Sequence, residues 1–327
     1  MMKASFINFI NRLLENDLEG ALKEFSSYAS SKNCPKEVYI PAGAILRKLK
    51  EPLKAAHLHE SVLNEVSEEV KGALFLDLVK DYSDLKDYDK SIYYLTLLSK
   101  VSKLPAVYKL WYEILLKQGK FEESEKVCLK YQKASGKDLS KRLSYICLEG
   151  YKKTNNEHYL KKCLRYHPKN RGGRLLSLKN AIKLGKISKI QEEIDFIFHN
   201  EILRSFEDIK NIEKDVFELG IFSKVENVIS QKVASRVDNP IYYLAVADTL
   251  AKKGDSVKAS EILKDYISDF GKKNVVVNKY FEFVLPTEIG EKLKESKIYR
   301  CTKCGAVFEN YHDICPVCNH LERFVFI

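Results

Sequence analysis

The chain has 327 residues, of which 55 are Lys or Arg and 45 are Asp or Glu, so its formal net charge is +10. With 45% hydrophobic and 31% charged residues, its composition is that of an ordinary soluble globular protein. Only 14 Gly and 8 Pro occur, which excludes collagen-like, Pro-rich and broadly disordered chains. At roughly 100–200 residues per domain, the length allows two or three globular domains or one elongated array.

The N-terminal segment 1–14 places apolar residues at helical spacing between polar ones, which differs from the continuous apolar core of a signal peptide. No apolar run approaches the ~18 residues that a membrane-spanning helix requires. We therefore expect a cytoplasmic protein without a transmembrane helix.

A repeat of about 35 residues organises most of the sequence. Segment 184–190 recurs as 219–225, and Gly254 follows 34 residues after Gly220. Apolar residues at helical spacing flank each repeated position, and Gly or Asn there can adopt the left-handed conformation that ends a helix. The unit is therefore predicted to be a helical hairpin. The eight predicted turns are at Asn16, Lys50, Lys86, Gly119, Asn155 or Asn156, Gly185, Gly220 and Gly254.

Small residues twelve positions apart refine this prediction. Gly43 pairs in this way with Ala55, and Ala247 with Ala259, so that the two helices of a hairpin can cross closely. The pattern resembles the tetratricopeptide repeat, whose period is about 34 residues. Several repeats depart from this pattern. The alternative is a generic helical bundle in which the spacing is coincidental. In other hairpins, the position in the second helix is also small, at Ala21, Ser91 and Ser124. The matching position in the first helix is larger in two of them, where Val79 and Tyr112 replace the expected small residue.

The predicted fold is all-α: a tetratricopeptide-like α-solenoid of about eight hairpins over residues 1–285, a connecting segment 286–297, and a small β module at 298–327. Stacked hairpins leave a concave groove that holds peptides or protein surfaces. Any one groove residue could equally belong to a solvated face. The candidate partner-binding residues are Lys109, Glu113 and Leu116 in the fourth hairpin, and Leu244, Asp248 and Ala251 in the eighth.

The C-terminal module carries four cysteines in the pattern C-x2-C-x10-C-x2-C. Two residues between cysteines let a tight turn direct both sulfurs at one ion, and Gly305 can adopt positive φ after the first pair. A closed set of four thiolates suits structural Zn²⁺, or iron in a rubredoxin-like setting. We expect a structural ion, because no flavin, haem or further cluster motif accompanies the cysteines. The predicted ligands are Cys301, Cys304, Cys315 and Cys318.

Three short strands are predicted around the metal site, within 298–300, 306–309 and 322–326. Because about thirty residues bury little core, the ion should supply much of this module's folding energy. His312 and His320 are expected to lie outside the coordination sphere, which four thiolates close. Cys34, Cys128, Cys147 and Cys163 are expected to be free thiols in the core.

Hairpins followed by Tyr299-Arg300-Cys301-x-x-Cys304-Gly305, Tyr311 and Cys315-Pro316-x-Cys318 resemble the lipopolysaccharide assembly protein B family. The resemblance implies a cytoplasmic repeat array with a rubredoxin-type module. It also implies an adaptor that regulates lipid A synthesis by linking the pathway's committing deacetylase to a membrane-anchored AAA+ protease, in association with lipopolysaccharide export components. Members of that family usually begin with a membrane-spanning helix, whereas this sequence starts at the first hairpin. Two alternatives follow: the tether has been removed from this sequence, or the protein reaches the membrane through its partners.

Two other classes of function are alternatives to the adaptor. A pI near 9.0 and 11% aromatic residues would also suit an RNA-binding protein, but the basic residues are spread over the helices without a recognised motif. An enzyme is not expected, because no phosphate loop or nucleophile motif occurs. In addition, His57, His59 and His158 have no partner at useful spacing.

Overall fold

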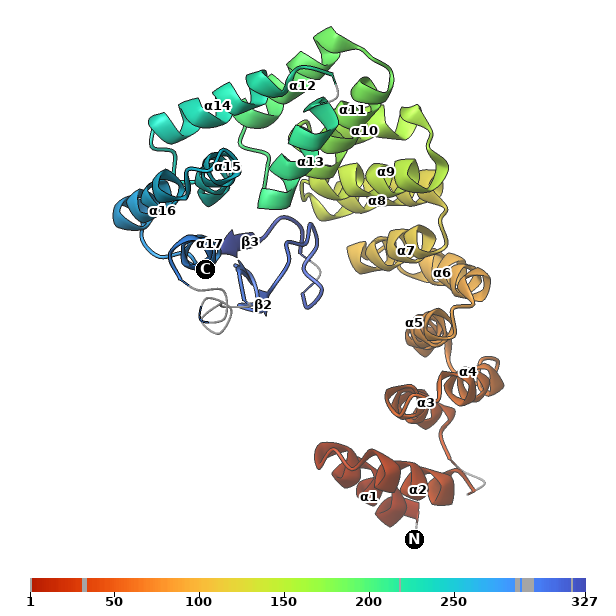
Figure 1. Cartoon of the computed structure of the whole chain (residues 1–327). Helices are drawn as coiled ribbons and strands as arrows, with labels where there is room; N and C mark the ends of the chain where they lie inside the picture. The colour runs from red at the N-terminus through yellow and green to blue at the C-terminus, as the bar shows by residue number, and fades with distance from the viewer. Residues whose placement is uncertain (1, 31–33, 218, 286–288, 290–296, 319) are drawn as a thin grey trace. The chain divides into compact units, whose positions relative to one another are not determined.

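The structure is a computed structural model that describes residues 2–30, 34–217, 219–285, 289, 297–318 and 320–327. The chain forms two compact units, Met1–Asn156 (unit 1) and Glu157–Ile327 (unit 2). The predicted boundary at residue 285 stays a prediction, and most of the predicted connecting segment 286–297 lies outside the described residues. Figure 1 shows both units, coloured along the chain.

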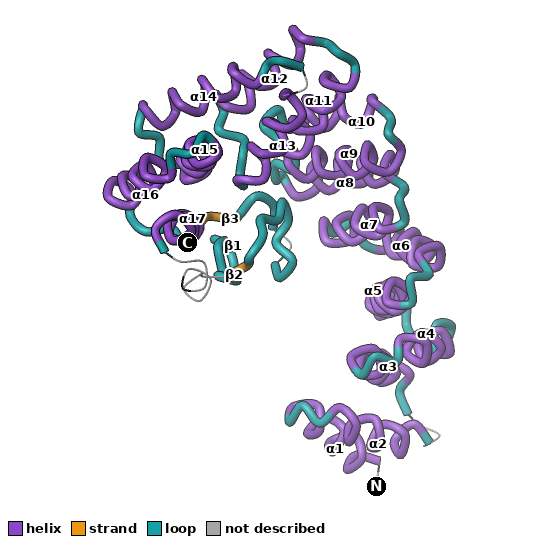
Figure 2. Tube along the Cα trace, in the orientation of Figure 1, coloured by secondary structure: helices purple, strands orange, loops and turns teal. Residues whose placement is uncertain are grey.

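Helical hairpins build both units (Figure 2). The helices of unit 1 are α1 (Met2–Leu14), α2 (Leu18–Ala29), α3 (Tyr39–Lys48), α4 (Pro52–Ser61), α5 (Glu68–Asp84), α6 (Tyr88–Val101), α7 (Pro105–Lys117), α8 (Phe121–Ser135) and α9 (Ser140–Thr154), with the 3-10 turn η1 (Lys36–Val38) before α3. Those of unit 2 are α10 (Glu157–Tyr166), α11 (Arg171–Lys183), α12 (Ile187–His199), α13 (Phe206–Phe217), α14 (Phe222–Ala234), α15 (Pro240–Lys252), α16 (Ser256–Phe270) and α17 (Asn274–Val284).

All eight predicted turns have the left-handed backbone that ends a helix. Gly119 has a φ of 80° and Gly254 one of 87°. Asn155, not Asn156, takes this conformation in the fifth hairpin, with a φ of 56°. Lys50 and Lys86 adopt it as well, at 64° and 60°, although a Cβ atom makes it costly. The period read from the sequence therefore marks the helix ends of both units.

The small-residue spacing marks the place where paired helices cross. The Ser91 hydroxyl on α6 donates a hydrogen bond to the backbone carbonyl of Val79 on α5, at 3.2 Å. The Ser124 hydroxyl on α8 likewise donates to the carbonyl of Tyr112 on α7, at 2.8 Å. Both serines lie twelve residues after their acceptors, as the repeat predicts. This close crossing gives the fold its tetratricopeptide-type hairpins.

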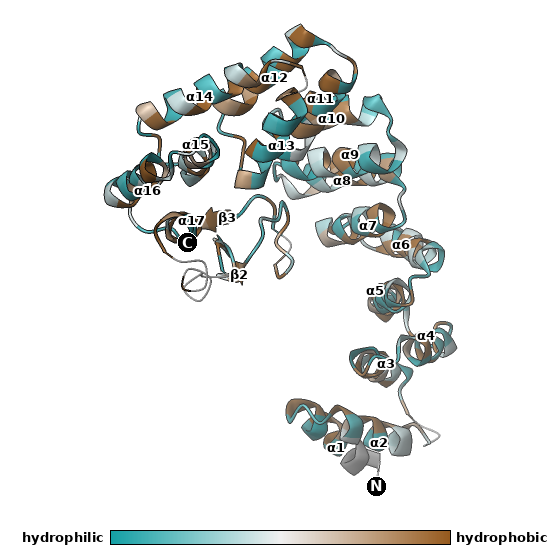
Figure 3. Ribbon diagram, in the orientation of Figure 1, coloured by the Kyte–Doolittle hydropathy of each residue, from teal (hydrophilic) through white to brown (hydrophobic). Residues whose placement is uncertain are grey.

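Apolar faces of the helices form the cores. Unit 2 holds a large cluster of buried residues between 178 and 276 and a small one between 299 and 324, and unit 1 holds separate clusters, among them 9–45 and 56–114. Figure 3 shows hydrophobic and hydrophilic residues alternating along the helices, as expected for elements that bury one side. Among the described helices, none is long and apolar enough to cross a bilayer.

A three-stranded antiparallel sheet ends unit 2. The central strand β1 (Tyr299–Cys301) pairs with β2 (Val307–Phe308) and with β3 (Phe324–Phe326). Tyr299 lies opposite Phe308 on one side and Phe326 on the other. Strands β2 and β3 lie within their predicted segments, whereas β1 extends one residue beyond its predicted segment 298–300, to Cys301. We refer to residues 298–327 as the cysteine module.

His59, expected to have no partner, is held in a buried polar network in unit 1. Its Nδ1 lies 2.5 Å from a carboxylate oxygen of Asp81, and its Nε2 lies 3.0 Å from the backbone oxygen of Ile40. Arg47 donates to the second oxygen of Asp81 at 2.5 Å. The side chains of His59 and Asp81 are fully buried, so a substrate cannot reach the pair. The network joins three helices, α3, α4 and α5.

Candidate functional site

Two tight turns position the four cysteines of the module. The first turn follows β1, where the Gly305 N–H donates to the Cys301 carbonyl at 2.9 Å and Gly305 has a φ of 76°, as predicted. In the second turn, the Cys315 N–H donates to the His320 carbonyl at 2.9 Å. The pairing of β1 with β3 brings the two turns together.

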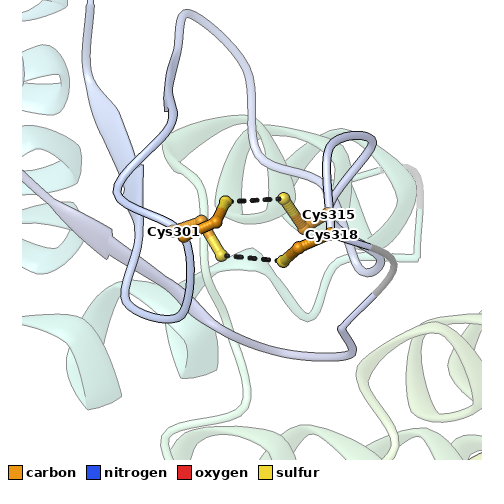
Figure 4. Close-up of side chains that lie close together, drawn as sticks. Cys301, Cys315 and Cys318 are labelled. Atoms are coloured by element: carbon orange, nitrogen blue, oxygen red, sulfur yellow. Dashed lines mark hydrogen bonds between the residues drawn. The ribbon is translucent and has the colours of Figure 1, made fainter. Parts of the chain in front are cut away.

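The four sulfur atoms converge on one point (Figure 4). Cys301 Sγ lies 3.7 Å from Cys318 Sγ, and Cys304 Sγ lies 3.7 Å from Cys315 Sγ. All four sulfurs lie within 4.8 Å of one another. A tetrahedral ion with Zn–S bonds of 2.3 Å separates its sulfurs by about 3.8 Å, whereas a disulfide needs about 2.05 Å. The spacing therefore fits a shared metal ion rather than disulfides.

The electrostatics of the cluster also favour a cation. Burial opposes ionisation of the Cys301 thiol, but the backbone N–H groups of Cys304 and Lys303 outweigh it and lower the pKa of Cys301 to about 7. Burial and the neighbouring sulfurs raise the pKa of Cys318 to about 12. The Cys301 thiolate thus forms readily, whereas ionisation of the Cys318 thiol needs a positive ion beside it. Such an ion, when bound, cross-links the two turns and leaves no ligand position open.

The two histidines of the module lie outside this donor set. His320 Nδ1 is 2.8 Å from the carbonyl oxygen of Cys318, which places it beside a ligand-bearing turn. The His312 ring packs against Phe308 and Phe324, with centroid distances of 5.4 and 5.8 Å. Among the described residues, the four cysteines are the one group of three or more side chains close enough together to hold a metal ion.

Aromatic rings form most of the rest of the module's core. Tyr299 packs on Phe326, with a centroid distance of 4.9 Å, and Phe324 packs on Phe308 at 5.2 Å and on Tyr311 at 5.7 Å. Apart from two of the cysteines, Tyr299 and Phe324 are the buried members of this small cluster. A core of this size supports the prediction that the ion contributes much of the folding energy.

Arg171 of α11 attaches the module to the hairpins of unit 2. Its guanidinium donates to both carboxylate oxygens of Asp208 on α13, at 2.9 and 2.5 Å. It also donates to Asp313 of the module at 3.1 Å and lies 5.0 Å from the centre of the Tyr311 ring. Asp208 in turn accepts hydrogen bonds from the backbone N–H groups of Arg204 and Ser205. Arg171, held on both sides by carboxylates, therefore links α11 to the loop between the two cysteine pairs.

Further contacts extend this attachment. The Tyr299 hydroxyl donates to the Arg204 carbonyl at 3.4 Å, and the Asn274 N–H at the start of α17 donates to the Ile327 carbonyl at 2.6 Å. Figure 1 shows the strands beside α13 and α17. Sequence reasoning missed this docking surface, because Arg171, Asp208 and Asp313 belong to no local motif.

The predicted groove residues of α7 are accessible to different degrees. Lys109 is exposed, whereas Glu113 and Leu116 are half-buried. Leu116 lines a cavity of about 610 Å³ in unit 1, together with exposed and buried side chains from the following helices. The residues that line it are Leu116, Lys117, Gln118, Gly119, Phe121, Tyr145, Glu149, Lys153 and Thr154.

The predicted groove residues of α15 are largely engaged within unit 2. Leu244 is 1% exposed, so its side chain belongs to the core and not to a partner surface. Asp248 forms ion pairs with Lys252 at 2.8 Å and with Lys279 of α17 at 3.8 Å. Ala251 is half-buried and packs against the core. Helix α17 therefore covers part of the surface that the repeat pattern left open.

The other cysteines are core residues, with one exception. Cys128, Cys147 and Cys163 are fully buried, as expected for apolar filler. Burial raises the pKa of Cys128 to about 12, which makes its thiol unreactive. Cys34 is half-buried and lies in the short connection before η1.

Comparisons with known proteins give similarity in fold alone. Neither the family models nor the curated proteins compared with this chain include a match. Among solved structures, a tetratricopeptide repeat protein from Parabacteroides merdae shares 11% identity, covering 86% of this chain and 98% of its own, at a TM-score of 0.35. The C-terminal part of a TPR repeat-containing protein from Cytophaga hutchinsonii shares 13% sequence identity with this chain. The match covers 88% of this chain and 100% of the other, at a TM-score of 0.45.

A third solved structure, Naa15/Naa10 bound to HypK-THB, shares 12% identity over 87% of this chain and 50% of its own, at a TM-score of 0.36. All three TM-scores are below 0.5. The assignment of tetratricopeptide-type hairpins therefore rests on the turn positions and helix crossings described above.

Proposed function

We propose that the protein is a non-catalytic adaptor that binds other proteins through its hairpins. The observation that supports this most directly is the cavity beside α7, where the half-buried Leu116 and the buried Phe121 lie next to the exposed Lys117. A partly apolar hollow with a charged rim is typical of protein-binding surfaces. Lys109 and Glu113 continue the same face of α7 and complete the proposed surface.

We further propose that this adaptor regulates lipid A synthesis, as members of the lipopolysaccharide assembly protein B family do. Hairpins followed by a docked four-cysteine module support this reading, with residues 1–285 as repeat array, 286–297 as connector and 298–327 as metal domain. The proposed partners are the deacetylase of the pathway, the membrane-anchored protease and lipopolysaccharide export components. The adaptor would act in the cytoplasm and reach the inner membrane through them. Zn²⁺ is the proposed ion, with iron as the alternative.

Affinity purification of the tagged full-length protein from its host tests this function. The native protein should enrich the deacetylase or the protease, and Leu116→Asp should weaken that enrichment because it places a charge in the cavity beside α7. Leu129→Asp is the matched control, since Leu129 is 40% exposed on the neighbouring α8. Absence of both partners would contradict the lipid A role. RNA retained on filters across a salt series would instead favour the nucleic-acid alternative.

A further inference from the structure

Three helices of unit 2 enclose a second, smaller cavity of about 110 Å³. Ile229 and Ala245, each 2% exposed, form its floor, whereas Ser230 and Lys253 are exposed at its rim. It therefore runs from the surface into the core. A water molecule needs roughly 10–15 Å³ of such space, so the cavity accommodates a larger group. The lining residues are Glu213 of α13, Glu226, Ile229 and Ser230 of α14, Ala245, Val246, Thr249 and Leu250 of α15, and Lys253, which directly follows α15.

Glu213 is the unusual member of this lining. The residue is 9% exposed, and its Oε1 atom is buried without a hydrogen-bond partner. Within the described part of the chain, Glu213 forms no ion pair. Burial is the largest effect on its carboxyl group and raises the pKa. The positive charges of Lys252 and Lys210 partly oppose this rise, and the negative charges of Asp248 and Glu226 add to it. Burying a carboxylate without a partner costs free energy, because the charge loses its hydration. A cationic ligand that pairs with Glu213 recovers part of this cost and therefore binds favourably.

The charges around Glu213 are engaged elsewhere. Glu226 pairs with Lys253 at 2.8 Å. Asp248 pairs with Lys252, also at 2.8 Å. Lys210, one turn earlier on α13, lies over the Phe206 ring at 4.7 Å from its centre. These groups leave Glu213 as the carboxylate that an incoming cation can neutralise.

We propose that this cavity binds the cationic end of a lysine or arginine side chain from a protein partner, with Glu213 as the counter-charge. Val246 and Leu250 would contact the methylene stem, and the hydroxyl groups of Ser230 and Thr249 would accept further N–H groups. A divalent metal ion is a poorer ligand, because Glu226 is already paired and a single carboxylate supplies too few oxygens. The inference rests on the proposed protein-binding function and names the partner chemistry of one site.

Methyl NMR of the full-length protein, labelled at isoleucine and alanine methyl groups, tests the site. The probes are Nα-acetyl-lysine methylamide and Nα-acetyl-arginine methylamide, and their uncharged counterparts are the norleucine and citrulline derivatives. The cationic probes should shift the Ile229 and Ala245 signals saturably, and the uncharged ones should not. Glu213→Gln should weaken binding about tenfold or more, because it removes a charge-assisted hydrogen bond. Glu207→Gln, exposed on the same helix, should leave binding unchanged.

Equal shifts with the norleucine derivative, or no shift with any probe, would overturn the inference. This comparison uses the native protein, so it stands even if a variant fails to fold. The two proposals also fail separately. Partner recovery that is unaffected by Glu213→Gln contradicts the cation site alone. Probe binding without any recovered partner contradicts the adaptor function alone.

Discussion

Gly43 lies directly against the imidazole ring of His59, so that a Cβ atom on residue 43 would come within 2.3 Å of Nε2. The repeat pattern assigned Gly43 to the crossing with Ala55, but the histidine sets the tighter limit. Asp81 and the Ile40 carbonyl hold the ring from both of its nitrogens. The ring therefore cannot move away without losing buried hydrogen bonds.

Gly43→Ala should consequently destabilise unit 1 by about 1–3 kcal/mol, through overpacking against a fixed ring. Gly72→Ala is the matched control, because a Cβ there meets only a Val101 methyl group at 3.8 Å. In the interior of α5 this control should stabilise by about 0.5–1 kcal/mol, since alanine is the better helix former. Urea unfolding followed by circular dichroism measures both. Equal stability of the two variants would contradict the packing argument.

Lys86→Gly should stabilise unit 1 by about 0.5–1 kcal/mol. A left-handed residue with a Cβ costs about 1–2 kcal/mol, and the greater freedom of glycine in the unfolded chain offsets part of the gain. Lys126→Gly, in the interior of α8, is the control and should destabilise by about 1 kcal/mol. Melting temperatures should move in opposite directions for the two lysines. A lower melting temperature for Lys86→Gly would reject the prediction.

Ala259→Leu should destabilise unit 2 by about 1–3 kcal/mol, because Ala259 is fully buried where α15 and α16 cross. Ala234→Leu, on an exposed position at the end of α14, should change stability by less than about 0.5 kcal/mol. Thermal unfolding of both variants provides the measurement. A melting curve of Ala259→Leu that matches the native protein would show that this crossing tolerates a large side chain.

Cys304→Ser should lower the metal content to well below one ion per chain and loosen the cysteine module, because three thiolates no longer close the site. Cys34→Ser, outside the cluster, should retain the metal. Elemental analysis gives the metal content and distinguishes zinc from iron, and limited proteolysis reports the loosening. Full metal occupancy in Cys304→Ser would count against the assigned ligand set.

Asp208 should make the attachment of the module sensitive to acid. Burial opposes its ionisation, but Arg171 and the N–H groups of Arg204 and Ser205 outweigh burial and lower its pKa. Its stabilisation is therefore complete above the unfolded pKa of about 3.9 and disappears as pH falls through the lowered value. Asp208→Asn should be less stable than the native protein at pH 7, and the difference should shrink below about pH 4.

Urea unfolding at several pH values measures this difference. Asp195→Asn serves as the control, because Asp195 is 58% exposed and its ion pair with Lys224 contributes little. A gap between native protein and Asp208→Asn that stays constant down to pH 2 would argue against the Arg171 pairing.

Local signals explain what the sequence predicted. The turns recur at a regular period, and the four cysteines form two close pairs within 301–318, so period and spacing sufficed to find them. The contacts around Arg171 could not be found in this way, because its two carboxylate partners lie 37 and 142 residues later. Leu244 was assigned to the wrong environment, since the pattern within one hairpin does not show what the next helix covers.

The long separation between Arg171 and Asp313 has a consequence for biosynthesis. Arg171 leaves the ribosome 142 residues before its acidic partner. At about 5–20 residues per second, this delay lasts roughly 7 to 28 s. Helix α13 emerges during this interval, whereas Asp313 of the cysteine module emerges only at its end. Until then, the side of α11 that the cysteine module will contact stays exposed on the nascent chain.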